Sequence, residues 1–123
     1  MYEVRESLNA KAGLGLFATA DIKIYTKIAE IKGECVTNED YQKLPKKTQA
    51  YCVQLNSTKV LVGLCGDGRF ANCCYRDPLK RTNNAWLSKW KGQIFVKSKR
   101  KIRKGEEILA SYGNSYTRYL LKD

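Results

Sequence analysis

Hydrophobic positions along this chain form short runs separated by glycines, with no long helical period between them. Branched and aromatic residues within 23–31 favour extended structure there. We expect strands near residues 2–4, 15–19, 27–31, 51–55, 59–63, 93–97 and 107–109. The nine glycines are expected to mark the turns between them. The pattern therefore predicts a mainly β fold with compact, irregular connections.

Two short helices are expected beside the strands. Thr37 or Asn38 can cap a helix whose first turn is acidic, which suits the helix dipole, and Pro45 stops it. A second helix is expected over residues 115–121, where apolar side chains recur on one face.

Length and composition limit the class of protein. The 123 residues, 43% of them hydrophobic and 28% charged, predict one globular domain spanning residues 1–123. No apolar run approaches the ~20 residues that cross a bilayer, and the first residues do not resemble a secretory leader, so we expect an intracellular protein without membrane contact. The five cysteines are then expected to be reduced and buried as small apolar side chains. Because histidine is absent and no cysteines have zinc-ligand spacing, no metal site is predicted.

The chain is strongly basic, with a net charge of +11. Such an excess favours polyanionic partners, nucleic acid first. The densest basic stretch is 97–104. It is either a strand edge and turn whose charges stay hydrated, or a contact to DNA on a nucleosome.

Three sequence features could carry chemistry, although each has a plain structural alternative. Gly13 and Gly15 let the backbone approach a ligand, but such a pair is usually a hairpin turn; because an apolar strand follows, it is not a dinucleotide loop. Asn72 offers the donors and acceptor that an amino-acid headgroup needs, or it is a surface residue beside a turn. Gly105 starts a turn and strand that deliver Tyr112, which alone would be a core or surface side chain.

Taken together and in this order, these features resemble the SET domain of lysine methyltransferases. The matching stretches are G-x-G-L-F-A from Gly13, R-F-x-N from Arg69, N-A from Asn84 and G-E-E-I-x-x-S-Y-G from Gly105. The resemblance covers essentially the whole chain. It implies a SET-domain (β-clip) fold of short strands and few short helices, in which the C-terminal segment threads under the R-F-x-N loop as a pseudoknot. The chain is similar to minimal members of the family that have no zinc-binding post-SET segment.

The resemblance implies an S-adenosylmethionine-dependent protein-lysine N-methyltransferase, with a histone tail as substrate. Tyr112 is implied as the catalytic tyrosine beside the transferred methyl group. The implied cofactor-binding residues are Ala12, Gly13, Leu14, Gly15, Tyr51, Arg69, Phe70, Asn72 and Cys73. The implied substrate channel consists of Leu87, Ala110, Tyr112 and Tyr116.

The expected chemistry needs alignment and a neutral amine. A free lysine has a pKa of about 10.4 and is protonated at neutral pH. A dry aromatic channel and a neighbouring sulfonium charge both disfavour the ammonium form. Orientation then supplies much of the rate enhancement, without metal or covalent nucleophile.

Departures from the family pattern leave other functions open. Cys73 stands where the family usually has histidine, and residues 74–83 form a longer insertion that we expect to be a basic loop near the cofactor entrance. A catalytically degenerate SET-like module that binds chromatin or another protein is one alternative. A basic, β-rich nucleic-acid binder is the other.

The expected partners are a histone substrate, DNA or a nucleosome through the basic surface, and a second copy of the chain through Trp86 or Trp90. The implied location is nuclear or chromatin-associated.

Overall fold

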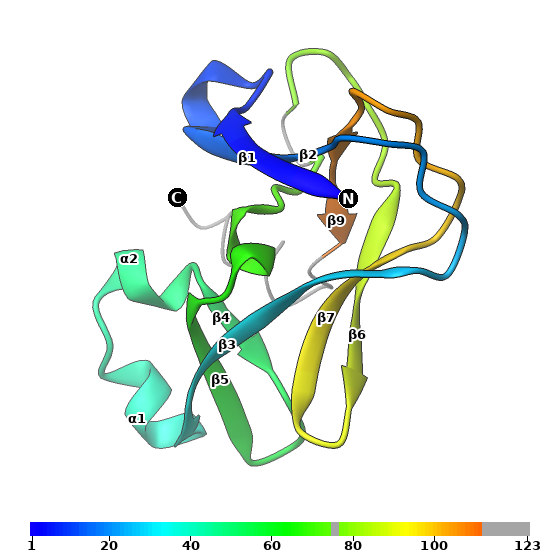
Figure 1. Ribbon diagram of the computed structural model, residues 1–123. Helices are drawn as coiled ribbons and strands as arrows, with labels where there is room; N and C mark the ends of the chain where they lie inside the picture. Colours follow the sequence, from blue (N-terminus) through cyan, green and yellow to red (C-terminus); the bar gives the residue numbers. More distant parts are fainter. Residues whose placement is uncertain (75–76, 112–123) are drawn as a thin grey trace.

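The computed structural model describes residues 1–74 and 77–111. Strands dominate, accompanied by short helical segments, as the hydrophobic pattern predicts (Figure 1). In chain order the elements are β1 (Tyr2–Glu6), η1 (Ala10–Ala12), β2 (Leu14–Ala18), β3 (Lys27–Thr37), α1 (Asn38–Gln42), α2 (Lys46–Gln49), β4 (Cys52–Gln54), β5 (Lys59–Cys65), η2 (Asp67–Phe70), β6 (Ala85–Trp90), β7 (Gln93–Ser98), β8 (Glu107–Ile108) and β9 (Ala110–Ser111). None of the helices among these described residues is long and apolar enough to span a membrane.

The strands form two sheets over a shared core. One sheet has the order β1-β2-β8, and the other has the order β4-β5-β3-β7-β6-β9. The long strand β3 pairs with β7 through its first half and with β5 through its second half. A single hydrophobic cluster joins Leu16 and Ile108 of the smaller sheet to Ile31, Ile94 and Val96 of the larger one. The burial of these apolar side chains holds the two sheets together.

Strand β7 shows how the sequence selects its two faces. Ile94, Val96 and Ser98 are buried, whereas the alternate positions Phe95 and Lys97 are partly exposed. This period of two is typical of a strand that covers a core on one side. β7 lies between β3 and β6, so residues 97–98 of the basic stretch belong to an internal strand and not to a sheet edge.

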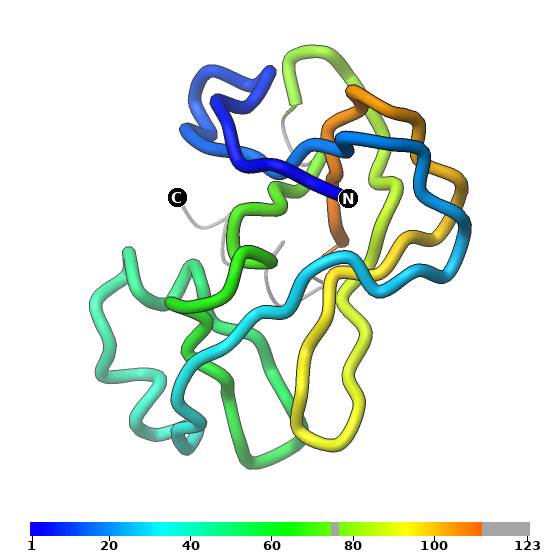
Figure 2. The backbone as a smooth tube through the Cα atoms, viewed as in Figure 1, coloured from blue at the N-terminus to red at the C-terminus, as the bar shows by residue number. Residues whose placement is uncertain are grey.

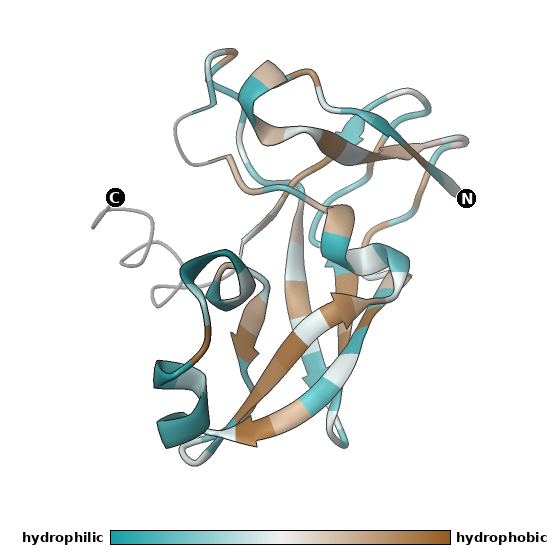
Figure 3. Cartoon of the chain, turned by 90° about the vertical axis from the view of Figure 1, so that its left-hand side faces the viewer, coloured by the Kyte–Doolittle hydropathy of each residue, from teal (hydrophilic) through white to brown (hydrophobic). Residues whose placement is uncertain are grey.

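The first predicted helix begins as expected. The Thr37 side chain accepts a hydrogen bond from the Asp40 backbone N–H, 3.2 Å away, as an N-cap does. α1 ends before Pro45, which then caps the separate helix α2. Figure 3 shows both helices as mostly hydrophilic segments on the flank of the sheet. The predicted second helix, over residues 115–121, lies outside the described residues.

The C-terminal strands lie between two distant segments of the chain. β9 pairs with β6 in parallel, Ala85 opposite Ala110 and Trp86 opposite Ser111. On the other side, Asn72 forms a parallel bridge with Leu109, and its carbonyl accepts from the Ala110 N–H at 2.7 Å. Residues 109–111 thus lie between the R-F-x-N segment and β6. Figure 2 shows a second long-range approach, where the segments around Ile22 and Ile102 run side by side.

Several local predictions were wrong. Gly33 lies within strand β3 and not in a turn. Strand β6 was not predicted. The cysteines are not buried: Cys35 and Cys65 are exposed, while Cys52, Cys73 and Cys74 are partly exposed. Cys52 and Cys65 are at strand ends, Cys73 and Cys74 are in a loop, and Cys35 is in the exposed second half of β3.

Candidate functional site

The first glycine turn is open on its outer side. Asn9 caps the short helix η1, and Gly13 ends it with φ +76°, a conformation that favours glycine. The Gly13 carbonyl accepts from the Ser7 backbone N–H at 2.8 Å. A Cβ on Gly13 would meet nothing within 4 Å, so the exposed backbone of this turn is accessible to a ligand.

Asn72 joins this turn to the C-terminal strands. Its side-chain amide donates to the Leu14 carbonyl at 2.9 Å, and the same nitrogen lies 3.4 Å from Oε2 of Glu107. Its backbone carbonyl binds Ala110. Three sequence motifs far apart in the chain therefore meet at this one asparagine.

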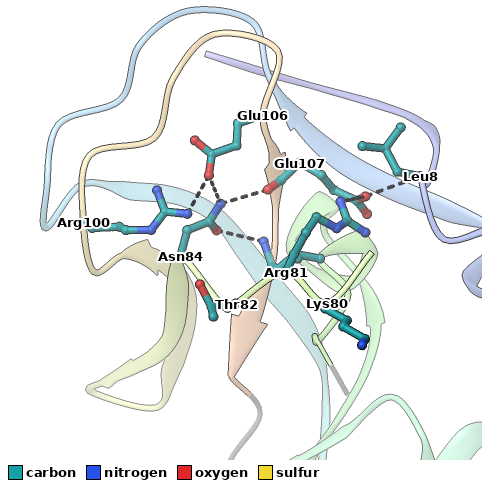
Figure 4. Close-up of a pocket in the computed structure, with 9 residues that line it drawn as sticks. Leu8, Lys80, Arg81, Thr82, Asn84, Arg100, Glu106 and Glu107 are labelled. Atoms are coloured by element: carbon teal, nitrogen blue, oxygen red, sulfur yellow. Dashed lines mark hydrogen bonds and ion pairs between the residues drawn. The ribbon is translucent and has the colours of Figure 1, made fainter. Parts of the chain in front are cut away.

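Glu107 is a buried carboxylate with several donors. Its side chain is fully buried, and it receives hydrogen bonds from Ser7 Oγ at 2.7 Å and from the Leu8 backbone N–H at 3.1 Å. Arg81 Nη1 adds an ion pair at 2.7 Å (Figure 4). We call Glu107 with Ser7, Asn72 and Arg81 the carboxylate network. Because a buried charge is costly without partners, these donors are what allow Glu107 to sit in the interior.

The second glycine of the turn serves this network. A Cβ on Gly15 would lie 2.5 Å from Oε2 of Glu107 and 3.2 Å from the Ser7 Cβ. Gly15 is buried, so its missing side chain makes room for a carboxylate inside the protein. Glycine is therefore needed at the two positions for different reasons. Gly15 makes room for Glu107, whereas Gly13 borders open space.

Arg81 connects the predicted insertion, residues 74–83, to the rest of the protein. Its Nε and Nη2 donate to the two oxygens of Asp77 at 2.8 and 3.0 Å, and its backbone N–H donates to the same carboxylate. These hydrogen bonds from Arg81 lower the pKa of Asp77 to about 2, and the Asp77 and Glu107 carboxylates raise the pKa of Arg81. Residues 77–81 therefore form an ordered turn, bound at one end to Glu107.

Asn84 fixes the strand that enters from the other side. Its Nδ2 donates to the Glu107 carbonyl and to Glu106 Oε2, each at 2.9 Å, and its Oδ1 accepts from the Leu109 N–H at 2.8 Å. Burial favours a higher pKa for Glu106, but hydrogen bonds from Asn84, Arg100 and the Arg103 backbone outweigh it and lower that pKa. Asn84 is only 1% exposed, and its side chain thus provides hydrogen-bond partners for the buried backbone groups of Glu107 and Leu109.

A pocket of about 430 Å³ opens beside these groups. Its lining residues are Leu8, Lys80, Arg81, Thr82, Asn84, Arg100, Glu106, Glu107 and Leu109 (Figure 4). Both arginines are paired there, Arg81 with Glu107 and Arg100 with Glu106 at 2.7 Å. None of the predicted cofactor-binding residues lines this pocket.

The remaining predicted cofactor residues lie at several places in the fold. Arg69 and Phe70 belong to η2, where the guanidinium lies 4.1 Å from the Phe70 ring and donates to the Gly66 carbonyl. Cys73 follows Asn72 directly and is partly exposed. Ala12 precedes the glycine turn in η1. Tyr51 is exposed just before β4, with its carbonyl bonded to the Gly63 N–H, and no described contact joins it to the turn.

The predicted substrate channel is described in part. Ala110 is fully buried in the core, and Leu87 is partly buried against it. Tyr112, the predicted catalytic residue, and Tyr116 lie outside the described residues. The channel therefore stays a prediction.

Sequence reasoning did not assign Ser7, Arg81, Asn84 or Glu107 to the site. Asn84 and Glu107 were within the matching motifs, so their motif membership was the available signal. Arg81 was taken as part of a basic loop, and nothing in the sequence pairs it with residues 77 and 107. Among residues 1–74 and 77–111, no three His, Cys, Asp or Glu side chains are grouped to hold a metal ion.

The open turn, with Asn72 beside it, could hold the amino-acid part of a cofactor. The exposed Gly13 backbone permits close approach, and Asn72 keeps Leu14 in place. An exposed turn of this kind is compatible with S-adenosylmethionine.

Comparisons with known proteins agree with this arrangement. The family model of the SET domain matches residues 13–113. No curated protein matches the chain. Among solved structures, the chain is similar to a Plasmodium falciparum protein described as a "putative histone methyltransferase", with a TM-score of 0.69 and 25% identity over 94% of this chain and 96% of that one. The mainly β fold of the SET domain is thereby confirmed.

Proposed function

Because the chain belongs to the SET-domain family of methyltransferases, we propose that it is an S-adenosylmethionine-dependent protein-lysine N-methyltransferase that acts on a histone tail. The histone part of this proposal is supported by the description of the Plasmodium falciparum neighbour. A histone substrate would place the protein at chromatin.

The observation that carries the proposal is the meeting of the motifs at Asn72. This residue binds Leu14 of the glycine turn and Ala110 of the C-terminal strand, which are nearly the full chain apart. Ser111 pairs with Trp86, and Tyr112 follows it directly in sequence. On this ground we propose Tyr112 as the catalytic tyrosine that acts with the Gly13 turn.

In the proposed reaction, the chain's own residues bind and orient. Gly13 exposes its backbone to the ligand, and Asn72 fixes the carbonyl of Leu14. When bound, S-adenosylmethionine supplies a methyl group on a positively charged sulfur. Tyr112 would hold the methyl group in line with the lysine amine through weak C–H···O contacts, and a dry channel would favour the uncharged amine.

A catalytically degenerate binding module is the second candidate, favoured by Cys73 at the family's histidine position. Such a protein would keep the fold held by Asn72 and Glu107 but would transfer no methyl group.

The test is transfer of label from radiolabelled S-adenosylmethionine to core histones, with Tyr112→Phe beside the unaltered chain. We expect transfer by the unaltered chain and a loss of about 100-fold or more in the variant, since orientation of the reacting groups is lost. Calorimetry with the cofactor alone separates binding from chemistry.

Cofactor binding without transfer to any core histone or histone peptide would support the degenerate module. Unchanged transfer by Tyr112→Phe would contradict the role proposed for this residue. Tyr25→Phe, at an exposed position outside the predicted cofactor and channel residues, is the matched control for loss of a phenol hydroxyl.

A further inference from the structure

One face of the larger sheet carries exposed aromatic rings. Strands β3, β7 and β6 lie side by side, and their buried face covers the core (Figure 1). On the opposite face, Trp86 pairs with Lys97, and Trp90 and Phe95 follow on the same side by the period of two. Tyr25, in the turn before β3, stacks on Trp86 with 6.3 Å between ring centroids and 25° between planes. We call Tyr25, Trp86, Phe95 and Trp90 the aromatic face.

These rings are strongly exposed for their size. Tyr25 is 60% exposed, Trp90 59% and Trp86 40%. Large apolar rings in a group on a surface usually mark a binding site, because their burial against a partner is favourable. Trp86 and Trp90 lie four residues apart on one strand, or about 13 Å.

The protein holds Tyr25 in position at a cost. Its φ of +62° is unfavourable for a bulky residue. The turn is fixed by the fully buried Ser98, whose hydroxyl donates to the Lys23 carbonyl at 2.6 Å and accepts from the Thr26 N–H at 2.8 Å. The Ser98 carbonyl also accepts from the Tyr25 N–H at 2.9 Å. The ring is therefore preorganised next to Trp86.

Lysines accompany the rings. Lys27 Nζ lies 4.7 Å from the centroid of Phe95, Lys91 Nζ lies 5.6 Å from that of Trp90, and Lys97 Nζ lies 6.0 Å from that of Tyr25. Glu30, opposite Phe95, places a carboxylate on this face, 4.0 Å from Lys32. The face thus combines exposed π surfaces with positive charge.

We propose that the aromatic face binds single-stranded nucleic acid, with unpaired bases stacked on its rings and phosphates beside Lys27, Lys91 and Lys97. Aromatic rings on an open sheet with flanking cations suit unpaired bases, which expose both a flat surface and a phosphate chain. A duplex keeps its bases stacked inside and would use the lysines alone. A second copy of this chain would bring two positive faces together, which the net charge of +11 disfavours.

The rings lie on the face of β6 opposite the predicted channel residue Leu87, and the test of this proposal needs no cofactor. Both tryptophans of the chain lie on the aromatic face, so intrinsic tryptophan fluorescence reports on this face. The probe is a fluorescein-labelled single-stranded DNA of about 12 nucleotides, a length typical of stacking sites. Its perfect duplex and inorganic polyphosphate are the comparison ligands. We expect binding of the single strand with tryptophan quenching, and weaker binding of the duplex without quenching.

Two variants test the two parts of the site. Trp90→Ala should weaken binding of the single strand at least about fivefold, since it removes a stacking surface. Lys27→Gln with Lys97→Gln should weaken binding and lower the salt dependence by about 1.4 in log–log slope, for two lost phosphate contacts. The matched control is Lys43→Gln with Lys47→Gln, which removes two exposed lysines near α1 and α2, on the opposite flank of the sheet.

The outcomes separate the proposal from its rivals. Equal affinity for duplex and single strand, or equal loss of binding in the control pair, would show diffuse charge attraction and overturn the proposal. So would quenching by polyphosphate as strong as by DNA, unchanged affinity of Trp90→Ala, or self-association through the rings in sedimentation. Circular dichroism of each variant establishes that it is folded.

Discussion

The carboxylate network and the aromatic face reverse the usual distribution of polar and apolar groups. The network places a charged carboxylate in the interior, where Ser7, Asn72 and Arg81 surround Glu107. The aromatic face places Trp86 and Trp90 in solvent. A buried charge is kept when its partners fix a specific arrangement, and an exposed ring is kept when something binds it. The first region therefore concerns how the motifs are assembled, and the second concerns what the protein meets.

The largest effect should come from Glu107→Ala. The substitution leaves Ser7 Oγ, the Leu8 N–H and Arg81 Nη1 without their acceptor, while Arg81 keeps its pair with Asp77. Breaking a buried ion pair costs about 3–5 kcal/mol. Urea unfolding followed by circular dichroism measures the loss. Trp90→Ala is the control, expected to change the free energy of unfolding by less than about 0.5 kcal/mol because the ring is exposed. Similar losses in the two variants would remove the contrast between the two regions.

A smaller effect should distinguish the two glycines. Gly15→Ala introduces a Cβ against Glu107 and Ser7, and overpacking of this kind costs about 1–3 kcal/mol. Gly13→Ala meets open space and costs about 1–3 kcal/mol, because its positive φ is a backbone conformation that side-chain-bearing residues rarely adopt.

A double substitution separates the two causes in the same unfolding measurement. Glu107→Ala should relieve much of the cost of Gly15→Ala but none of the cost of Gly13→Ala. If the losses in free energy of unfolding of Gly15→Ala and Glu107→Ala simply added in the double variant, the contact between Gly15 and Glu107 would be contradicted.

The smallest effect should appear with acid at the Asp77 turn. Hydrogen bonds from Arg81 lower the pKa of Asp77 from 3.8 to about 2, so the native protein binds this proton less readily than the unfolded chain. The resulting stabilisation is present above the unfolded value and is lost as the pH falls from about 4 toward 2. At pH 7 the free energy of unfolding of the unaltered chain should be about 1 kcal/mol larger than that of Asp77→Asn. This difference should shrink as the pH falls from about 4 toward 2.

Arg81→Gln tests the cause of this pH dependence. Without the guanidinium, the acid-dependent stabilisation by Asp77 should largely disappear in unfolding curves measured from pH 7 to pH 2. If the difference between the unaltered chain and Asp77→Asn stayed constant over this range, the Asp77–Arg81 pair would not be its source.

The sequence predicted those parts of the fold that depend on local patterns. The strand predicted near residues 93–97 corresponds to β7, and Thr37 caps α1 as predicted. α1 ends at Gln42, and Pro45 begins the separate, unpredicted helix α2. β6 was missed because its tryptophans face outward while Ala85 and Leu87 face the core, which hides the usual alternation. The same outward rings belong to the aromatic face.

The candidate site was predictable only as motifs. Their order indicated that Gly13, Asn72 and the C-terminal strand would meet, and the contacts of Asn72 agree. The role of Glu107 could not be predicted, since its partners come from residues 7, 8, 72 and 81 and become neighbours only in the tertiary structure. Gly15 looked like a ligand-facing glycine for the same reason.

The insertion of β8 and β9 between Asn72 and β6 has a consequence for how the chain reaches its native state. During synthesis the ribosome releases Ser7 long before Glu107, so the earlier strands must wait for the last tenth of the described chain before their polar groups find acceptors. Contacts between such remote residues close slowly, because the entropy of a long loop is lost first. We expect the nascent protein to stay incompletely folded until Glu107 and β9 have emerged.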